Sequence, residues 1–349
     1  MDNFSIIKIF ILTTLSFVVA MSWTPGLTYF LFKYKLGKKI RDEKSAPIMS
    51  ALHKEKSGTP TMGGVLIWVT VLFLALLVFY LGEWTGLEFL KKFNFLTRSQ
   101  TLLPLGALVA SALVGLVDDY LNARGIGPNG GGFRVRHKLL MYTLIAVVGA
   151  WWFYFKLDWH TIHVPFLGNF DIGLWYIPIF IFIIVATSFS VNESDGLDGL
   201  AGGLLLAAFA TYGAIAFAQG KMDLAAFCGV IVGALLAFLW FNINPARFFM
   251  GDTGAMSLGV TLGIVAMLTN SVLLLPVIGF LFVVESISVI VQILSKKIRK
   301  KKIFLSAPIH HHLEAKGWSE PKIVMRFWVI AGVAAVVGLI ISLMDVGLG

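Results

Sequence analysis

Long apolar stretches alternate with polar connections along the whole chain. Most of the apolar stretches are near the ~20 residues that cross a bilayer as a helix, and the third and eighth are shorter. The ten stretches run roughly over residues 6–32, 62–81, 102–117, 139–155, 173–191, 200–219, 224–241, 254–269, 272–294 and 324–344. This pattern predicts an all-α polytopic membrane protein with about ten transmembrane helices and one domain covering residues 1–349.

The composition agrees with a membrane protein. Hydrophobic residues make up 58% of the chain, and the mean hydropathy is +0.85, which excludes an ordinary soluble core. The single cysteine, Cys228, lies in an apolar stretch, so it cannot form a disulfide within the chain and is expected to pack as a small buried residue. The first apolar stretch is too long for a signal-peptide core, and we expect it to remain as an uncleaved first helix.

Lysine and arginine lie mainly in alternate connections. The odd-numbered connections, 33–61, 121–138, 190–199, 243–252 and 296–326, contain 8, 4, 0, 1 and 9 of them, or 22 of the 28. The positive-inside rule therefore places these connections in the cytoplasm and both termini outside. Topology and anionic lipid headgroups then account for the net charge of +9 without nucleic acid as a partner. The outward stretch 159–172 has the alternation of a small external hairpin.

The polar clusters that suggest chemistry all fall on odd-numbered connections, which favours one active site on the cytoplasmic face. The most unusual cluster is NESDGLDGLAGG, residues 192–203. Asn192, Asp195 and Asp198 repeat every third residue, so on a helix they would share one face. Carboxylates beside hydrocarbon are costly and are usually retained for function. Capping of the next helix would explain one of these Asp residues, but seldom both together with Asn192.

Acidic residues also stand at the ends of two other apolar stretches. Asp118 and Asp119 end the third helix in GLVDDY, where the helix dipole and mutual repulsion both disfavour them. A nearby cation would offset that cost, and adjacent acids suit a magnesium–diphosphate site. Asp252, in FNINPARFFMGDTG, precedes the eighth helix and either caps it or meets a ligand beside Gly251 and Gly254.

Two clusters contain groups that suit a nucleotide. In KSGTPTMGG, residues 56–64, capping explains the threonines, whereas Lys56 suits a phosphate contact. Asn242 and Phe249 offer hydrogen bonding and stacking to a base, although an isolated aromatic is more often part of a core.

The last odd-numbered connection combines a basic run with three histidines. Lipid anchoring is the default explanation for the basic run. His310, His311 and His312 are consecutive, and consecutive residues of a regular backbone cannot all face one metal, so we expect contacts to phosphate or carboxylate, or loop packing, in preference to zinc. Upstream, Glu285 and Gln292 are seven residues apart, on one face of the ninth helix.

These motifs, in this order, resemble the phospho-N-acetylmuramoyl-pentapeptide transferase family. The resemblance rests on KSGTPTMGG, GLVDDY, SVNESDGLDGLAGG, FNINPARFFMGDTG and APIHHHLE and runs over essentially the whole chain. The acidic motifs are shared across the polyprenyl-phosphate N-acetylhexosamine-1-phosphate transferase superfamily, whereas PTMGG and APIHHH are more specific. Glu193 and Ser194 depart from the usual small apolar residue and Thr, and 122–132 is unusually rich in glycine.

The resemblance implies a magnesium-dependent enzyme of the bacterial cytoplasmic (inner) membrane that functions in peptidoglycan synthesis. It would transfer phospho-MurNAc-pentapeptide from UDP-MurNAc-pentapeptide to undecaprenyl phosphate, giving lipid I and UMP, and it allows a homodimer. The implied catalytic residues are Asp118, Asp119, Asp252 and His310, with the three Asp residues as candidates for Mg²⁺. The implied substrate-binding residues are Lys56, Thr61, Lys138, Asn192, Asp195, Gly196, Asp198, Asn242, Phe249, Gln292, His311 and His312.

Among the acids, we expect Asp252 to hold the metal and Asp118 to take the proton of the lipid phosphate. Asp119 would support it or position magnesium. The resemblance allows a one-step or a two-step transfer, and we prefer direct attack because it needs no covalent enzyme intermediate. Two other functions remain open at this point. A sister enzyme would transfer GlcNAc-1-phosphate to polyprenyl phosphate, and a secondary transporter would use the carboxylates along an ion path. The transporter would need acids near the midplane and inverted repeats, whereas most of the acids here stand at one edge.

Overall fold

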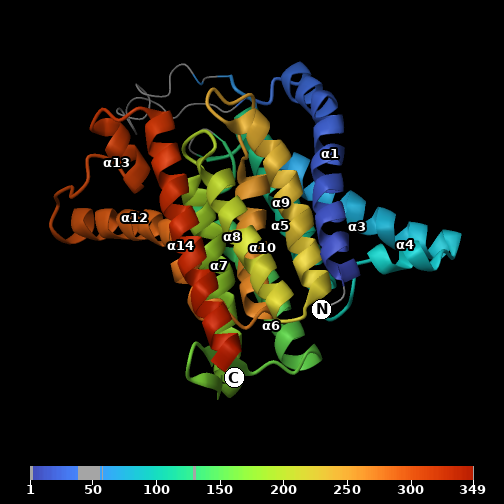
Figure 1. The fold of residues 1–349 in the computed structure, drawn as a ribbon. Helices are drawn as coiled ribbons and strands as arrows, with labels where there is room; N and C mark the ends of the chain where they lie inside the picture. Colours follow the sequence, from blue (N-terminus) through green and yellow to red (C-terminus); the bar gives the residue numbers. More distant parts are fainter. Residues whose placement is uncertain (1–2, 38–55, 57, 129–130, 349) are drawn as a thin grey trace.

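Helices form nearly all of the regular structure, and most of them run side by side in a bundle (Figure 1). The computed structural model describes residues 3–37, 56, 58–128 and 131–348. The long helices are α1 (Asn3–Lys33), α3 (Val65–Thr85), α5 (Leu102–Arg124), α6 (Val135–Trp151), α7 (Tyr176–Ser194), α8 (Leu200–Ala218), α9 (Met222–Asn242), α10 (Asp252–Leu268), α12 (Phe280–Ile298) and α14 (Glu320–Leu348). The short elements are α4 (Glu88–Phe93), η3 (Trp152–Lys156), β1 (Thr161–Val164), β2 (Gly168–Asp171), η4 (Gly173–Trp175), η5 (Val272–Leu274), α11 (Leu275–Ile278) and α13 (Ile309–Ala315).

The all-α polytopic class is confirmed, and eight of the described helices are long and apolar enough to cross a membrane. The eighth expected stretch forms α10, whose 17 residues would extend about 26 Å, somewhat less than the ~30 Å hydrocarbon core. The ninth expected stretch is not a straight span, which corrects the sequence prediction. It breaks between α11 and α12, which are bent by 81°. Pro276 in the first turn of α11 and Gly279 at its end explain the break.

As a result, α12 runs across the direction of the other helices and protrudes from the bundle (Figure 1). It carries Glu285 and Gln292 on its buried face, as their spacing predicts. The helices α4 and α13 were not expected from the apolar pattern, because one is short and the other lies in a polar connection. The expected hairpin within 159–172 is present as the antiparallel pair β1–β2.

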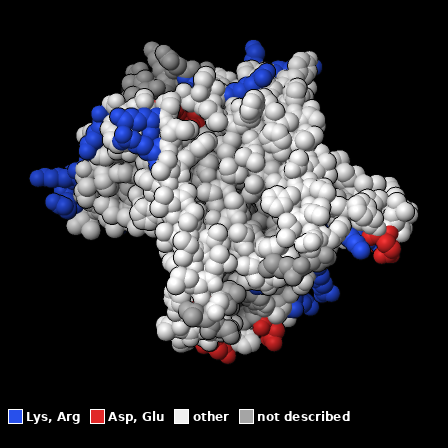
Figure 2. Space-filling model, in the orientation of Figure 1, with Lys and Arg blue, Asp and Glu red and all other residues white. Residues whose placement is uncertain are grey.

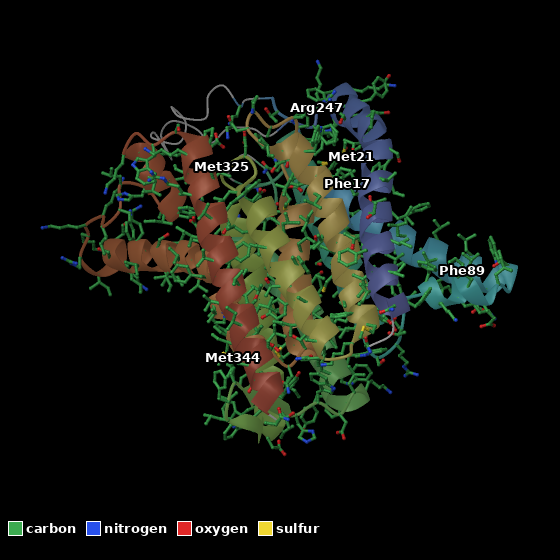
Figure 3. All side chains as sticks on the ribbon, in the orientation of Figure 1. Phe17, Met21, Phe89, Arg247, Met325 and Met344 are labelled. Atoms are coloured by element: carbon green, nitrogen blue, oxygen red, sulfur yellow. The ribbon has the colours of Figure 1, made fainter. Side chains whose placement is uncertain are left out.

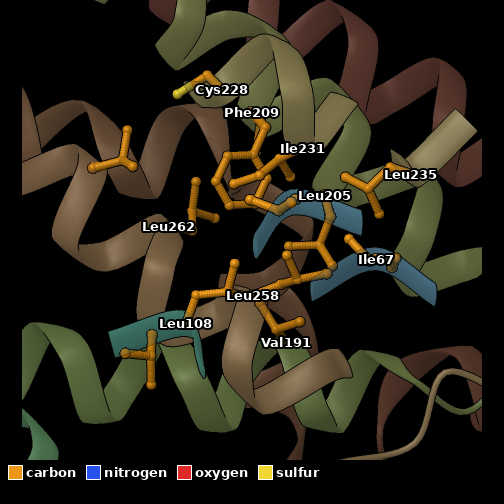
Figure 4. Close-up of a cluster of buried hydrophobic side chains, with 14 of the residues drawn as sticks. Ile67, Leu108, Val191, Leu205, Phe209, Cys228, Ile231, Leu235, Leu258 and Leu262 are labelled. Atoms are coloured by element: carbon orange, nitrogen blue, oxygen red, sulfur yellow. The ribbon is translucent and has the colours of Figure 1, made fainter. Parts of the chain in front are cut away.

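Helix α10 forms the centre of the bundle. Every residue from Thr253 to Leu268 is buried, and the helix packs mainly against α5 and α7. Around it lies a continuous cluster of buried apolar side chains that includes Leu258, Leu262 and Phe209 (Figure 4). Cys228 is a buried free thiol within this cluster, as its apolar surroundings predict. Surrounding helices cover α10 on all sides, which is why a short helix can be accommodated there.

Glycines allow backbones to approach closely at the places that position the candidate site. A Cβ built on Gly64, before α3, would lie 2.3 Å from the Cα of Gly254 in α10. A Cβ on Gly115 of α5 would lie 2.5 Å from the carbonyl carbon of Asp252. Side chains larger than hydrogen cannot fit at these distances, so the glycines in PTMGG and GLVDDY hold α3 and α5 against the start of α10.

Charged residues on the view in Figure 2 lie near the two ends of the bundle, at the tip of α12 and around α4, leaving a broad uncharged region between α12 and α4. Both termini lie toward the same end (Figure 1). Arg247, between α9 and α10, lies at the opposite end from Met344 of α14 (Figure 3). This arrangement is that of a multi-pass membrane protein. Residues 38–55, which carry much of the first basic connection, fall outside the described part of the chain.

Candidate active site

Three carboxylates from two helices meet where α5 approaches the start of α10. Asp118 and Asp119 lie in the last two turns of α5, and Asp252 is the first residue of α10. Each of the three residues offers an oxygen, and these oxygens lie within 4.8 Å of one another. Asp118 and Asp119 are each 3% exposed. Residues that are more than 130 positions apart in sequence therefore form one compact acidic group, with the geometry of a candidate metal site.

Asp119 is held by the backbone at the start of α10. Its carboxylate accepts hydrogen bonds from the backbone N–H of Asp252, at 3.1 Å, and of Thr253, at 3.0 Å. The positive end of the α10 dipole favours this carboxylate. Asp252 does not cap its own helix, as one sequence interpretation allowed, because Gly251 occupies the N-cap position without a side-chain cap. The cap comes instead from Asp119 of α5, which leaves the side chain of Asp252 available for other contacts.

Lys138 of α6 lies between the other two carboxylates. Its Nζ is 2.7 Å from Oδ2 of Asp118 and also forms a salt bridge with Oδ2 of Asp252. The second oxygen of Asp252 accepts a hydrogen bond from Nδ2 of Asn192, at 2.8 Å. The backbone N–H of Phe133 donates to Asp118. The structure thus brings four of the predicted substrate-binding or catalytic residues, Asp118, Lys138, Asn192 and Asp252, into one contact group.

The group retains an excess of negative charge. When ionised, the three carboxylates carry three negative charges, and the ammonium of Lys138 offsets one, which leaves two. A divalent cation would neutralise this remainder, and carboxylate oxygens are the ligands that Mg²⁺ prefers. The residues present therefore fit Mg²⁺ in number, chemistry and spacing.

Asp195 contacts the same region from the end of α7. Its Oδ2 accepts a hydrogen bond from the backbone N–H of Gly251, at 3.2 Å. A Cβ built on Gly251 would lie 2.7 Å from Oγ1 of Thr61, so the predicted Thr61 also lies against this turn. The expectation that Asn192, Asp195 and Asp198 share one helical face is wrong, because α7 ends at Ser194. The turn that follows directs the three side chains to different partners.

Asp198 belongs to a second polar group, which includes the predicted Lys56. The Nζ of Lys56 lies 2.6 Å from Oδ1 of Asp198 and 2.5 Å from Oε1 of Glu320 at the start of α14. Asn244 donates from Nδ2 to Oδ2 of Asp198 at 3.0 Å and to Oε2 of Glu320 at 3.2 Å. The same Nζ lies 5.8 Å from the centre of the Phe249 ring. Lys56 therefore joins the two carboxylates to the candidate stacking residue.

Two members of this group, Glu320 and Asn244, were not identified from the sequence. An acid that opens a helix is already explained by the dipole, so Glu320 gave no separate signal. Asn244 lies within FNINPARFFMGDTG, where only Asn242 was selected. Asp198 does not cap α8, which corrects that structural alternative, since Gly199 is the N-cap residue with φ at 80°.

Asn242 holds the turn beside this group. Its Oδ1 accepts from the backbone N–H of Gly199 at 3.0 Å, and its Nδ2 donates to the carbonyl of Phe248 at 2.8 Å. Both ends of the amide are therefore engaged by backbone. Its substrate-binding role stays a prediction, and the contacts described here position Gly199 and the segment before Phe249.

The three histidines lie on α13 and face different partners. Consecutive residues of a helix are about 100° apart, so they point in three directions. His310 pairs through Nδ1 with Oε2 of Glu285 at 2.9 Å, and His311 pairs with Oε2 of Glu314 at 2.6 Å. His312 accepts from the backbone N–H of Leu305 at 3.1 Å.

His310 is fully buried beside the NESDGLDGLAGG segment, residues 192–203. Nε2 of His310 and Oε1 of Glu285 have no hydrogen-bond partner among the described residues. A Cβ built on Gly196 would lie 2.2 Å from Nε2 of His310, so this glycine makes room for the ring. Gln292 lies further along α12, and its amide binds the backbone of Ile303 and Phe304. Gln292 thereby positions the segment that precedes the histidines.

Comparison with known proteins agrees with the motifs. A family model described as glycosyl transferase family 4 matches residues 101–270. A second model, described as phospho-N-acetylmuramoyl-pentapeptide-transferase signature 1, matches residues 56–67. A phospho-N-acetylmuramoyl-pentapeptide-transferase of Chloroflexus aggregans is 41% identical and aligns with 95% of this chain and 89% of its own length. A protein of the same name from Desulforapulum autotrophicum is 38% identical and aligns with 90% of this chain and 90% of its own length. Another, from a Geobacillus species, is 37% identical and aligns with 94% of this chain and 96% of its own length.

Proposed function

This chain belongs to the phospho-N-acetylmuramoyl-pentapeptide-transferase family, and from this membership we propose its reaction, cation and site. The protein transfers phospho-MurNAc-pentapeptide from UDP-MurNAc-pentapeptide to undecaprenyl phosphate. An oxygen of the lipid phosphate bonds to the phosphorus next to the sugar, and the bond between the two phosphates of the donor breaks. The products are lipid I and UMP.

The observation that best supports this proposal is the group formed by Asp118, Asp119 and Asp252 with Lys138. The reaction brings a phosphate against a diphosphate, so anions must approach one another and their repulsion must be offset. Mg²⁺ held by the three carboxylates would supply that charge and polarise the diphosphate. Lys138, at 2.7 Å from Asp118, adds a positive charge from the protein itself.

We assign different roles to the carboxylates because their contacts differ. Asp119 is fixed by two backbone N–H groups of α10, so it is suited to hold position. Asp252, oriented by Asn192, is suited to bind the cation. Asp118 accepts the proton of the lipid phosphate and returns it to solvent. The lipid phosphate is itself a competent nucleophile, so direct attack needs no covalent step on the enzyme.

The nucleotide binds on the side of Lys56 and Phe249. Lys56 is half-buried against Asp198 and Glu320, which holds its Nζ near the Phe249 ring. A base stacked on Phe249 would place the donor phosphates between Lys56 and the three carboxylates. We assign Asn192, Asp195 and Gly196 to the same donor, because Asn192 and Asp195 contact Asp252 and the backbone of Gly251.

The membrane orientation follows from charge. The odd-numbered connections of the sequence contain 22 of the 28 Lys and Arg residues, so we assign the side that carries the site to the cytoplasm and both termini to the outside. The β1–β2 hairpin should then lie outside. A reporter enzyme that functions only outside the cytoplasm should be active when it is fused within this hairpin. Activity of a reporter that functions only in the cytoplasm, fused at the same position, would contradict the assigned orientation.

The donor identity is tested by UMP release from purified protein with Mg²⁺, undecaprenyl phosphate and one of two donors. We expect UMP from UDP-MurNAc-pentapeptide and little from UDP-GlcNAc. Equal or faster release with UDP-GlcNAc would instead assign the chain to the sister reaction, in which GlcNAc-1-phosphate is transferred. The 56–67 signature supports the muramoyl donor.

A further inference from the structure

A cavity lined by both polar and apolar residues lies at the end of the bundle opposite the three carboxylates. It has a volume of about 460 Å³ and is walled by the hairpin, the α8–α9 turn, the end of α10 and the last turns of α14. The residues that matter for its chemistry are His163, Lys221, Asn270, Ser271, Ser342 and Asp345. The transferase reaction does not use this cavity, because its substrates meet at the other end.

Lys221 is an incompletely paired ammonium on the cavity wall. Its Nζ donates to Oε1 of Gln219 at 3.0 Å and to the carbonyl of Leu268 at 2.7 Å. An ammonium has three N–H groups, and the third has no oxygen acceptor among the described residues, although the Trp159 ring centre lies 5.5 Å from the same Nζ. Within the described ranges, no carboxylate lies within the 4.0 Å that defines a salt bridge with this Nζ. Burial lowers the pKa of Lys221 to about 8, which reflects the cost of keeping an unpaired charge there.

The acid in the cavity already has its own partners. Asp345 pairs through Oδ2 with Nε2 of His163 at 2.5 Å, and its Oδ1 accepts from the backbone N–H of Phe166 at 2.7 Å. The other ring nitrogen of His163 faces Oδ1 of Asn169 at 2.9 Å. Both ring nitrogens of His163 therefore lie within hydrogen-bond distance of an oxygen, and Asp345 has a partner for each of its oxygens. The carboxylate of Asp345 is thus engaged by the hairpin and does not pair with Lys221.

A serine hydroxyl also belongs to the cavity wall. Ser342 of α14 is 4% exposed as a residue and lines the cavity. A hydroxyl can donate a hydrogen bond to an acceptor oxygen of a ligand. It stands with Lys221 among the donors available to a bound molecule.

We propose that this cavity binds a phosphoryl anion, either free or as the headgroup of an anionic lipid. A phosphoryl group has several acceptor oxygens, which matches the free N–H of Lys221 and the hydroxyl of Ser342, and lysine binds phosphate as a point charge. The cavity opens at an end of the bundle, where lipid headgroups lie. A bound headgroup would join the hairpin, α10 and α14.

Two binding measurements distinguish the sources of the anion. Isothermal titration of protein in phosphatidylcholine nanodiscs with inorganic phosphate tests the free anion, in the absence of Mg²⁺. Native mass spectrometry of protein from nanodiscs containing phosphatidylglycerol tests the lipid headgroup. Saturable binding is expected in at least one measurement, and the one that succeeds identifies the source.

Lys221→Gln should weaken that binding about tenfold or more, because a charge-assisted hydrogen bond is lost. Ser342→Ala should weaken it by a smaller factor, and it serves as the test if the first variant does not fold. The matched control is Lys156→Gln, which removes another lysine near a tryptophan ring, outside the cavity. UMP release should stay within about twofold in all three variants, so a failure here is distinct from failure of the proposed reaction.

The proposal is overturned if wild-type protein shows no saturable binding in either measurement. It is also overturned if Lys156→Gln weakens binding as much as Lys221→Gln, or if both cavity variants bind like wild type.

Discussion

The ammonium of Lys138 lies 2.7 Å from Oδ2 of Asp118 and also contacts Asp252, so a single cation on α6 bridges acids from α5 and α10. This bridge keeps two carboxylates close that would otherwise repel each other. It also leaves an excess of negative charge at the group, which makes the site ready for a divalent ion. The arrangement explains how acids at the end of an apolar bundle are retained despite their cost.

Asp118→Asn should remove most of the turnover, by a factor of about 10² to 10⁴, if this carboxylate accepts the proton of the lipid phosphate. Donor binding should change little, because the nucleotide side lies around Lys56. Steady-state UMP release and donor titration measure the two effects. Asp158→Asn, whose side chain is 97% exposed near the hairpin, is the control. Near-normal turnover of Asp118→Asn across pH would remove Asp118 from the role of base.

Phe249→Ala should raise KM for the donor more than it lowers kcat. A base stacked on an aromatic ring gains about 1–3 kcal/mol, and this contact is present before as well as during reaction. Initial rates over a range of UDP-MurNAc-pentapeptide concentrations separate the two constants. Phe170→Ala, an exposed position on β2, should leave both unchanged. An unaltered donor KM in Phe249→Ala would exclude stacking on this ring.

Gly64→Ala should destabilise the protein by about 1–3 kcal/mol or more, because overpacking forces backbones apart. The new methyl would lie 2.3 Å from the Cα of Gly254. Gly106→Ala is the matched control, since a Cβ there meets nothing within 4 Å. It should be neutral or stabilise α5 by up to about 1 kcal/mol. Thermal unfolding in detergent measures both, and equal melting temperatures would show that α3 and α10 are not in close contact.

Protein stability should depend on pH through the titration of Lys221. Comparison with Lys221→Gln separates this contribution from those of other groups. Burial lowers the pKa of Lys221 from 10.5 to about 8, whereas in the unfolded chain it stays near 10.4. Between these values the unfolded chain binds a proton that the folded chain has lost, so this group makes the folded state more stable as pH rises. The melting temperature of wild type relative to Lys221→Gln should therefore increase from about pH 7 to about pH 9.5 in phosphate-free buffer. A constant difference would contradict the buried, unpaired ammonium.

Much of the site could be predicted because its residues share one side of the membrane. The alternation of apolar stretches assigns Asp118, Asp195 and Asp252 to the same end without any knowledge of packing. The contacts between them could not be predicted, since Asp119 caps a helix that begins 133 residues later. Periodicity within a segment carries no information about which segments pack together.

Other features were missed for local reasons. The break before α12 depends on Pro276 and Gly279, and these residue types are common in membrane helices that remain continuous. Glu320 looked like an ordinary helix-opening acid, and its salt bridge to Lys56 spans 264 residues. The threefold spacing from Asn192 to Asp198 was misleading because the helix ends within it, at Ser194.

The most direct test of the central claim is UMP release as a function of Mg²⁺ concentration, in wild type and in Asp252→Asn, with both substrates present. We expect wild type to release UMP only with undecaprenyl phosphate and the cation. Asp252→Asn should need at least about tenfold more Mg²⁺ or show no response, because one carboxylate ligand is lost. Full UMP release by wild type in excess chelator, or the same Mg²⁺ midpoint in both proteins, would contradict the assignment of the Asp118–Asp119–Asp252 group as the magnesium site of the transferase.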